Sequence, residues 1–304
     1  MHALITGASG FVGRVLHRHL IDSGDHVTGL SRAKGSPDIT DRDGLRQTIG
    51  EASPDVVYHL AAQAHVPTSW ADPISTLRTN VEGTQNVLDA AHEASVGRVV
   101  VIGSAEVYGS LPPELMPLSE DTPLNPVSPY AASKVAAEAI ASQSHLGRGQ
   151  DVVRVRAFNH IGPGQQPNFV CAGLAHRIAV AERDRHRCIT VGSLAARRDF
   201  TDVRDVVQAY RLIAELGDAG DVYNVCSGVD TSIQDVADYL VELAHVPIGL
   251  VVDTGLIRTI DTPIVRGDHQ KLTAKTRWQP QISLEESLSD ILQDARERLD
   301  EPTT

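Results

Sequence analysis

Residues 2–13 read HALITGASGFVG, a short apolar run that leads into three glycines. After the glycines, Val12, Leu16 and Leu20 recur at the spacing of one helix face. The pattern predicts a strand, a tight glycine turn and a helix. Glycines allow a sharp turn and let backbone N–H groups approach an anion at the N-terminus of the helix. The stretch therefore predicts the pyrophosphate site of a dinucleotide.

The alternative for this stretch is an ordinary glycine turn without a ligand. The strand–turn–helix context at residues 2–13 favours the nucleotide site, because a glycine triplet alone would not decide between the two. The residues that we expect to line the pyrophosphate turn are Gly7, Ser9, Gly10, Phe11, Val12 and Gly13.

The second strand is expected at His26–Ser31. In a site that prefers NAD, an Asp or Glu about 20 residues past the glycines would bind the ribose hydroxyls. This chain has Arg32 after Ser31 instead. An arginine there could bind a 2′-phosphate, which favours NADP (NADPH) and leaves NAD possible. The alternative is a solvated loop arginine.

Apolar runs and helical patterns continue to alternate along the chain, which is typical of a parallel, doubly wound sheet. The next strands are expected at Val56–Leu60, Arg98–Gly103 and Asp151–Phe158, with one helix beginning at Asn80 and another at Tyr130. Ligands bind outside the carboxyl ends of such strands. The residues placed on that rim are Gly7, Ala61, Ser104 and Asn159. The cofactor is expected to contact Leu60, Ala61, Ala62, Gln63 and Asn80.

Beyond Phe158 the pattern becomes mixed. Helices are expected at Val170–Arg183, Val203–Leu216, Ser232–Ala244 and Ser283–Arg298, and a strand at Val222–Cys226. The fold class is therefore α/β, a Rossmann-type sheet with a smaller mixed α/β C-terminal domain. We expect residues 1–163 and 201–230 to form the NAD(P)-binding domain. Residues 164–200 and 231–304 would form the substrate domain.

The stretch Ser128–Lys134 is the expected centre of the chemistry. Ser128 can cap a helix that starts at Pro129. Tyr130 and Lys134 are then one turn apart on the same helix face. A protonated lysine near a phenol would lower the pKa of the tyrosine toward the working range of an acid–base catalyst. The alternative is a chance pair on a solvated helix.

Composition restricts the class of protein. The chain has 304 residues, of which 41% are hydrophobic, with a formal net charge of -12. It has no dense Lys/Arg tract and no apolar run of about 20 residues, so we expect neither a nucleic-acid nor a membrane partner. The three cysteines, Cys171, Cys188 and Cys226, have neither metal-ligand spacing nor a disulfide pattern. Together with a start that lacks a signal peptide, this predicts a cytoplasmic protein without a metal.

Several motifs together resemble the extended short-chain dehydrogenase/reductase family that acts on nucleotide sugars. They are residues 6–13, His59–Ala62, Tyr130–Lys134, Arg156–Asn159 with Gly162-Pro163, Arg198–Phe200 and Trp278–Pro280. Within the family the chain is similar to the GDP-4-keto-6-deoxy-D-mannose reductases, which form GDP-D-rhamnose. That likeness lies in residues 158–165, 198–205 and 220–228.

The resemblance implies a role for individual residues. Ser104 would hydrogen-bond the substrate 4-oxygen, Tyr130 would be the acid–base group, and Lys134 its electrostatic partner and a ligand of the nicotinamide ribose. Asp38 and Ile39 would lie along the adenine. The residues expected to hold the nucleotide diphosphate are Asn159, Arg198 and the pair Arg258 and Asp261.

Departures from the family pattern leave the reaction open. The segment Ala33–Pro37 is short, so a strand there is expected to be shortened or absent. Ala105 stands where dTDP-glucose dehydratases carry an Asp general acid, and Thr259 replaces a usual proline. Glu106 matches the dehydratase base that removes the C5 proton, but the similar reductases keep a Glu there too. It is either catalytic and substrate-binding or a structural carboxylate.

Three hypotheses follow for the function. The favoured one is a reductase that uses NAD(P)H on a GDP-4-keto-6-deoxy sugar. The second is a redox-neutral GDP-mannose 4,6-dehydratase or a 4-epimerase with tightly bound cofactor. The third is a cofactor-sensing protein without catalysis, since a fold does not fix a function. A complete set of Ser104, Tyr130 and Lys134 argues against the third.

The expected assembly is a homodimer. The helix that contains Tyr130 carries alanines on more than one face, including Ala137, which lets another helix approach closely. The resemblance implies a four-helix bundle formed by this helix, the helix at Asn80 and their copies in a second subunit. The alternative is burial of these faces within one subunit.

Overall fold

The structure is a computed structural model that describes residues 1–31, 35–253, 255 and 262–300. Arg32, Arg258, Thr259 and Asp261 lie outside the described residues. The main feature is a six-stranded sheet of the order β2-β1-β3-β4-β5-β9, in which every neighbouring pair is parallel. Its strands are β1 (His2–Thr6), β2 (His26–Leu30), β3 (Val56–His59), β4 (Arg98–Ile102), β5 (Val152–Ala157) and β9 (Val222–Val225). This confirms the predicted fold class.

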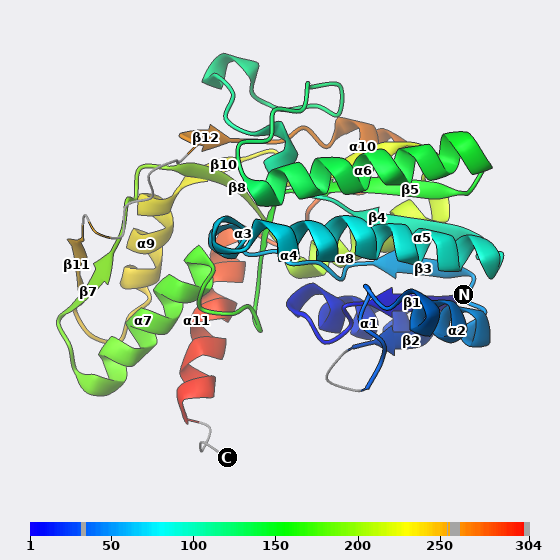
Figure 1. The fold of residues 1–304 in the computed structure, drawn as a ribbon. Helices are drawn as coiled ribbons and strands as arrows, with labels where there is room; N and C mark the ends of the chain where they lie inside the picture. Colours follow the sequence, from blue (N-terminus) through cyan, green and yellow to red (C-terminus); the bar gives the residue numbers. More distant parts are fainter. Residues whose placement is uncertain (32–34, 254, 256–261, 301–304) are drawn as a thin grey trace.

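Helices cover both faces of the sheet, as Figure 1 shows. One face packs against α1 (Phe11–Asp22), α8 (Val203–Leu216) and α10 (Gln270–Thr276). The other packs against α2 (Arg42–Ala52), α5 (Gly83–Glu93) and α6 (Pro129–Arg148). The strands between these layers are mostly apolar, because a parallel sheet is largely buried on both sides.

A smaller lobe has its own core beside the sheet. Its helices are α7 (Val170–Asp184), α9 (Ile233–Glu242) and α11 (Leu284–Asp300). Its strands are β6 (Asn159–Ile161), β7 (Cys188–Val191), β8 (Arg197–Asp202), β10 (Asp230–Ser232), β11 (Gly249–Val252) and β12 (Ile264–Val265). The proposed division of the chain into two domains stays a prediction. Leu272 and Trp278, which that division assigns to the substrate domain, pack in the core of the six-stranded sheet.

Buried aspartates tie the two lobes together around β8. Asp199 is 1% exposed and accepts hydrogen bonds from the N–H groups of Ser227, Gly228 and Gly267. Asp205 accepts from the N–H groups of Gln281 and Ile282. Burial raises the pKa of both carboxyl groups. The segment 199–205 thus connects the smaller lobe to the carboxyl end of β9.

Two helix starts illustrate what local sequence determines. Ser128 caps α6 by accepting a hydrogen bond from the N–H of Ala131, with Pro129 in the first turn, as predicted. Ser232, where a helix was expected to begin, caps α9 in a capping box with Asp235. In both cases the cap residue and its partner are close in sequence, so the signal is local.

The prediction that a helix begins at Asn80 is wrong. The helical run begins at Pro73 in α4 (Pro73–Leu77), continues through a π-helical segment at Arg78–Glu82, and then becomes α5. Asp72 caps its start by accepting from the N–H of Ser75. A short helix, α3 (Val66–Ala71), precedes it. The π-helical segment turns Asn80 inward, where it is 2% exposed.

Candidate active site

The glycine turn lies between the end of β1 and α1, where a bound dinucleotide would need it. Gly7 has a φ of +73°, and a Cβ there would lie 2.9 Å from the N atom of Ala61. Gly10 caps α1 without a side-chain hydrogen bond, so no side chain occupies the helix N-terminus. This cradle fits a pyrophosphate, which binds backbone N–H groups at such a helix end. Ser9, Phe11 and Val12 complete the turn, with Phe11 and Val12 packed partly on the sheet core.

The end of β3 is held beside this turn by a buried histidine. His59 bonds Thr6 through Nδ1 at 2.8 Å and Thr84 through Nε2 at 3.0 Å. Burial, with a further contribution from Lys134, lowers the pKa of His59 to about 3, so its imidazole is neutral. Thr6 also accepts from the N–H of Ala61 at 3.2 Å. His59 therefore supports the rim formed by Leu60, Ala61 and Ala62.

Asn80 holds the next residue of the rim. Its Oδ1 accepts from the N–H of Gln63 at 2.8 Å, and its Nδ2 donates to the Gln63 carbonyl at 3.0 Å and to Ser133 Oγ at 2.9 Å. These contacts use both amide hydrogens. We therefore see Asn80 as a residue that fixes Gln63 against α6, whereas we had expected a direct cofactor contact. The π-helical segment that turns it inward has no signal in the sequence pattern.

The two residues that we expect along the adenine, Asp38 and Ile39, lie in different surroundings. Ile39 is buried in the core, where its side chain packs against Gly83. Asp38 is half-buried and accepts hydrogen bonds from Thr40 N and Oγ1. Among the described residues between β2 and α2, 35–41, there is no strand, in agreement with the expected shortening.

Ser104 and Tyr130 meet at the carboxyl end of β4. Ser104 caps a short 3₁₀ helix, η3 (Ala105–Tyr108), by accepting from the N–H of Glu106 at 3.2 Å. Its hydroxyl lies close enough to Tyr130 to lower the pKa of the phenol. Tyr130 is 7% exposed, and its backbone N–H donates to Ser69 Oγ at 3.1 Å. The two hydroxyls therefore share one place on the rim.

The expected lowering of the tyrosine pKa is wrong for the protein without ligands. Burial raises the pKa of Tyr130 to about 12, the Ser104 hydroxyl opposes the rise, and the charge of Glu106 adds to it. Lys134 points elsewhere, since its Nζ donates to the Ile102 carbonyl at 2.8 Å. Burial lowers the pKa of Lys134 to about 8. At neutral pH both side chains are therefore protonated.

The predicted substrate residues come together in one pocket. Ser104, Glu106, Asn159 and Arg198 all line it, together with Thr262 and Val265 of the smaller lobe. Glu106 and Asn159 are exposed there. Arg198 is half-buried, and its Nη1 donates to the carbonyls of Arg197 and Thr262. The pocket thus offers carboxylate, amide and guanidinium groups next to the Ser104–Tyr130 pair.

Three further features of the described part of the chain concern membranes, metal ions and cysteines. No helix there is long and apolar enough to cross a bilayer. No group of three or more His, Cys, Asp or Glu in that part is arranged to hold a metal ion. The three cysteines, all described, are free, with Cys171 and Cys226 buried and Cys188 exposed.

The chain is similar to known proteins both in sequence and in structure. Residues 3–226 match the model of the NAD dependent epimerase/dehydratase family. The chain is 38% identical to GDP-6-deoxy-D-mannose reductase of Pseudomonas aeruginosa over 98% of both chains. It is 36% identical to dTDP-glucose 4,6-dehydratase of Streptomyces griseus over 82% of this chain and 80% of the relative. The structure of RMD from Pseudomonas aeruginosa complexed with NADPH matches 98% of this chain and 99% of its own, with 37% identity and a TM-score of 0.90.

The glycine cradle generates a prediction about cofactor affinity. A Cβ at Gly13 would collide with the backbone of Gly7 and Ala8. Overpacking of this kind costs about 1–3 kcal/mol, which corresponds to roughly fivefold or more in affinity. We expect Gly13→Ala to weaken NADPH binding by at least that factor, as measured by titration of nucleotide fluorescence.

The matched control is Gly50→Ala in α2, where a Cβ would meet nothing within 4 Å. It should leave NADPH affinity unchanged. Equal affinity of the Gly13→Ala protein and the control would show that the glycine turn does not bind the nucleotide.

Proposed function

The chain belongs to the NAD dependent epimerase/dehydratase family, and from this premise we propose that it is an NADPH-dependent nucleotide-sugar reductase. It reduces the C4 keto group of a GDP-4-keto-6-deoxy sugar and forms GDP-D-rhamnose. The observation that carries this proposal is the pocket lined by Ser104, Glu106, Asn159 and Arg198, beside which the buried Tyr130 keeps its proton at neutral pH. The GDP-6-deoxy-D-mannose reductase of Pseudomonas aeruginosa, 38% identical over 98% of this chain, supports the substrate.

The cofactor would lie along the carboxyl edge of the sheet. The glycine turn of Gly7, Gly10 and Gly13 would hold its pyrophosphate, and Lys134 its nicotinamide ribose. NADPH is the favoured form, because the similar RMD structure is complexed with NADPH. When bound, the reduced nicotinamide would supply the hydride for C4.

The protein's own residues would handle the proton. Ser104 would donate a hydrogen bond to the substrate 4-oxygen and hold it near Tyr130. Tyr130 would give its phenolic proton to that oxygen as negative charge develops there, a step for which a positioned acid contributes typically 10²–10⁴-fold. Its pKa of about 12 keeps the proton available at neutral pH. Lys134, still charged, would stabilise the phenolate that remains.

The pocket would bind the rest of the substrate. We propose that Asn159 and Arg198 hold the diphosphate, since a guanidinium donates parallel hydrogen bonds to phosphate oxygens. Glu106 faces the same pocket and would contact the sugar. Arg258 and Asp261 keep their expected roles as predictions. A cytoplasmic location also stays a prediction from the free cysteines.

The first test is turnover. NADPH mixed with the enzyme and freshly prepared GDP-4-keto-6-deoxymannose should be oxidised, and Tyr130→Phe should lower kcat by about 10²–10⁴-fold because the positioned acid is lost. Absorbance of NADPH follows the reaction. No oxidation with any 4-keto nucleotide sugar would contradict the reductase.

The same assay separates the alternative. A dehydratase or epimerase with tightly bound cofactor would convert GDP-mannose or a UDP-hexose without added NADPH. The similarity to dTDP-glucose 4,6-dehydratase of Streptomyces griseus is consistent with the dehydratase alternative. Product analysis without NADPH should show no conversion for the reductase.

The pH dependence of the reaction should report on Lys134. The charged ammonium is present below its pKa of about 8 and is lost as the pH rises through that value. We therefore expect kcat/KM to fall above about pH 8. Lys134→Arg, which stays charged, should remove the fall even if its rate is lower.

A matched control for the pH profile is Lys275→Gln, which removes a surface ammonium paired with Asp218. Its profile should equal that of the wild type. A wild-type profile that stays flat well above pH 8 would show that Lys134 does not act in its charged form.

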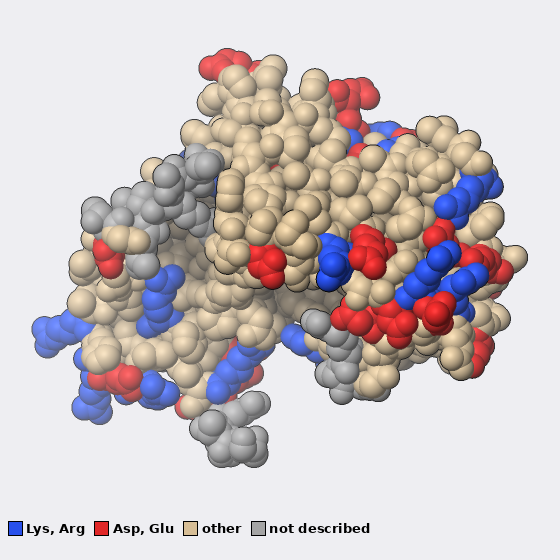
Figure 2. Space-filling model, in the orientation of Figure 1, with Lys and Arg blue, Asp and Glu red and all other residues tan. Residues whose placement is uncertain are grey.

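We also propose a two-fold symmetric dimer formed through α5 and α6, which contact each other and lie side by side in Figure 1. Large apolar side chains are exposed on α3, α4 and α6: Trp70, Ile74, Leu77 and Leu146. Figure 2 shows few charged side chains over α6. Exposed apolar side chains of this kind support an interface with a second copy, which in a two-fold dimer uses the same surface on both subunits.

The structure shows which alanines of α6 are buried and which are exposed. We had expected Ala137 to face outward, but it is 4% exposed. Ala139 is exposed on the same helix. Ala139→Glu should shift the dimer toward monomer in light scattering at micromolar concentration, because it places charges in an apolar interface.

The control for assembly is Ala274→Glu, at an exposed alanine of α10 on the opposite face of the sheet. It should leave the oligomeric state unchanged. A wild-type protein that is monomeric and fully active would rule out the proposed interface.

A further inference from the structure

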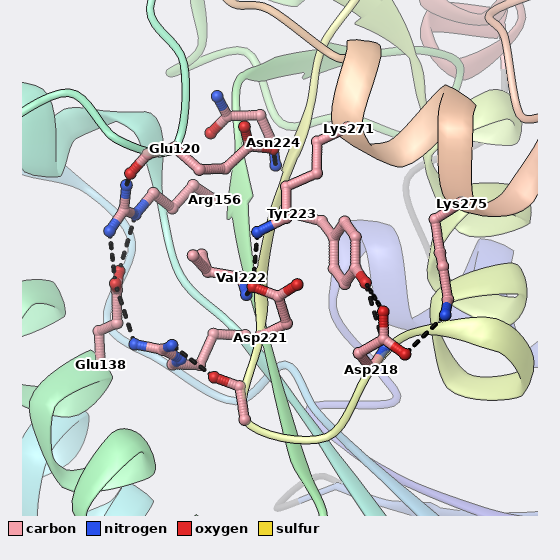
Figure 3. A network of polar contacts seen from close by, with 12 residues as sticks. Glu120, Glu138, Arg156, Asp218, Asp221, Val222, Tyr223, Asn224, Lys271 and Lys275 are labelled. Carbon is pink, nitrogen blue, oxygen red and sulfur yellow. Dashed lines mark hydrogen bonds and ion pairs between the residues drawn. The ribbon is translucent and has the colours of Figure 1, made fainter.

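Arg156 of β5 connects several parts of the fold behind the active site. Its side chain is buried, and its guanidinium donates hydrogen bonds to Glu138 of α6 and to the loop before α6 (Figure 3). It also donates one to η3. Nε and Nη2 donate to the two oxygens of Glu138 at 3.0 and 2.6 Å. Nη1 donates to Tyr108 Oη at 3.0 Å and to the Glu120 carbonyl at 2.8 Å. A buried guanidinium needs such a complete set of partners to offset its lost hydration.

The Glu138 contact fixes the helix that carries Tyr130 and Lys134. Glu138 lies one turn beyond Lys134 and two turns beyond Tyr130, and all three are buried on the inner side of α6. Two parallel hydrogen bonds between a guanidinium and a carboxylate restrict both distance and orientation. The pair therefore sets how far α6 extends along β5 and which face it turns toward the sheet.

The Tyr108 contact fixes the turn that carries Ser104. Tyr108 is the last residue of η3, the helix that Ser104 caps, and it is fully buried. Its hydroxyl accepts from Arg156 and donates to Asn224 Oδ1 of β9 at 2.7 Å. The guanidinium carbon of Arg156 also lies 5.0 Å from the centre of the Tyr108 ring. The turn is thus bonded to the same guanidinium as α6.

We propose that Arg156, Glu138 and Tyr108 are positioning residues, which hold Tyr130 and Lys134 on α6 in register with Ser104 on the neighbouring turn. The inference rests on the catalytic roles proposed above. None of the three is among the residues that line the pocket around Ser104 in the described part of the chain. They act on the reaction only through the two elements that they join.

The competing explanation is that the network only stabilises the fold. The two explanations can be separated, because removing one partner of a buried ion pair is strongly destabilising, whereas replacing both by apolar residues is often neutral. A double replacement can therefore restore stability without restoring the geometry that the hydrogen bonds impose.

The test is the double variant Glu138→Leu/Arg156→Met. We expect its Tm to lie well above that of Glu138→Leu alone, with NADPH affinity and KM little changed. Arg154, whose Nη1 lies 3.6 Å from Glu138, loses that partner in both variants. Its kcat for reduction should fall by about 10²-fold, the size of effect that a displacement of about 1 Å in a reacting group produces. A double variant with wild-type Tm and wild-type kcat would overturn the inference.

A second variant covers the case in which the double variant does not fold. Tyr108→Phe keeps the ring and removes only the hydroxyl that joins Arg156 to Asn224. We expect kcat to fall by about tenfold, a smaller displacement than in the double variant, with no change in NADPH affinity. An unchanged kcat in folded Tyr108→Phe would equally overturn the inference.

A similar ion pair at the other end of the sheet supplies the control. Arg98 Nε and Nη2 donate to the two oxygens of Asp151 at 2.9 and 2.8 Å, at the amino ends of β4 and β5. Arg98→Met/Asp151→Leu should leave kcat unchanged. If the wild type does not oxidise NADPH, the proposed function fails. If the wild type is active and both double variants match it, only the positioning inference fails.

Discussion

The burial of the Lys134 ammonium is the constraint on which the active edge of this structure depends. A charged amine that is 8% exposed loses most of its hydration, and burial lowers its pKa to about 8. Its direct partner is the Ile102 carbonyl at the end of β4, where the strand is about to leave the sheet. The hydrogen-bond partner of the ammonium is thus a fixed backbone dipole. It is not a mobile carboxylate, which would neutralise the charge.

The surroundings of this ammonium are correspondingly rigid. The imidazole of His59, which stands nearby, stays neutral, mainly because it is buried and further because a second positive charge there would be unfavourable. The next charged group along α6, Glu138, is already paired with Arg156, so its carboxylate does not compete for Lys134. Charge is therefore compensated locally, group by group, and each compensation also fixes an element of the fold.

Local signals in the sequence were sufficient for much of this arrangement. The glycine turn, the caps Ser128 and Ser232, and the one-turn spacing of Tyr130 and Lys134 are all contained in short stretches, and the structure has each of them. The rule of carboxyl strand ends brought Ser104 and Asn159 of the pocket to one edge, whereas Glu106 and Arg198 were expected there only from the resemblance to the family.

What could not be predicted depends on contacts between distant residues. The pKa of Tyr130 is set by burial, which the helix spacing does not contain. Ala137 and Ala139 are equally small and apolar, so only the packing of α6 distinguishes them. The network of Arg156 joins residues 18, 48 and 36 positions away, and Tyr108 pairs with Asn224 across 116. No periodicity links such positions.

The residues next to Ser104 bear on which reaction the site can perform. Loss of water from a sugar needs a base for one carbon and an acid for the departing hydroxyl, in addition to the groups at C4. Ala105, next to Ser104, is 8% exposed and has only a methyl group to present. Glu106 alone would have to take up one proton and deliver another. Ser104 and Tyr130 together suffice for a single proton transfer at C4, so the residue set favours a reaction in which reduction of that carbon is the net change.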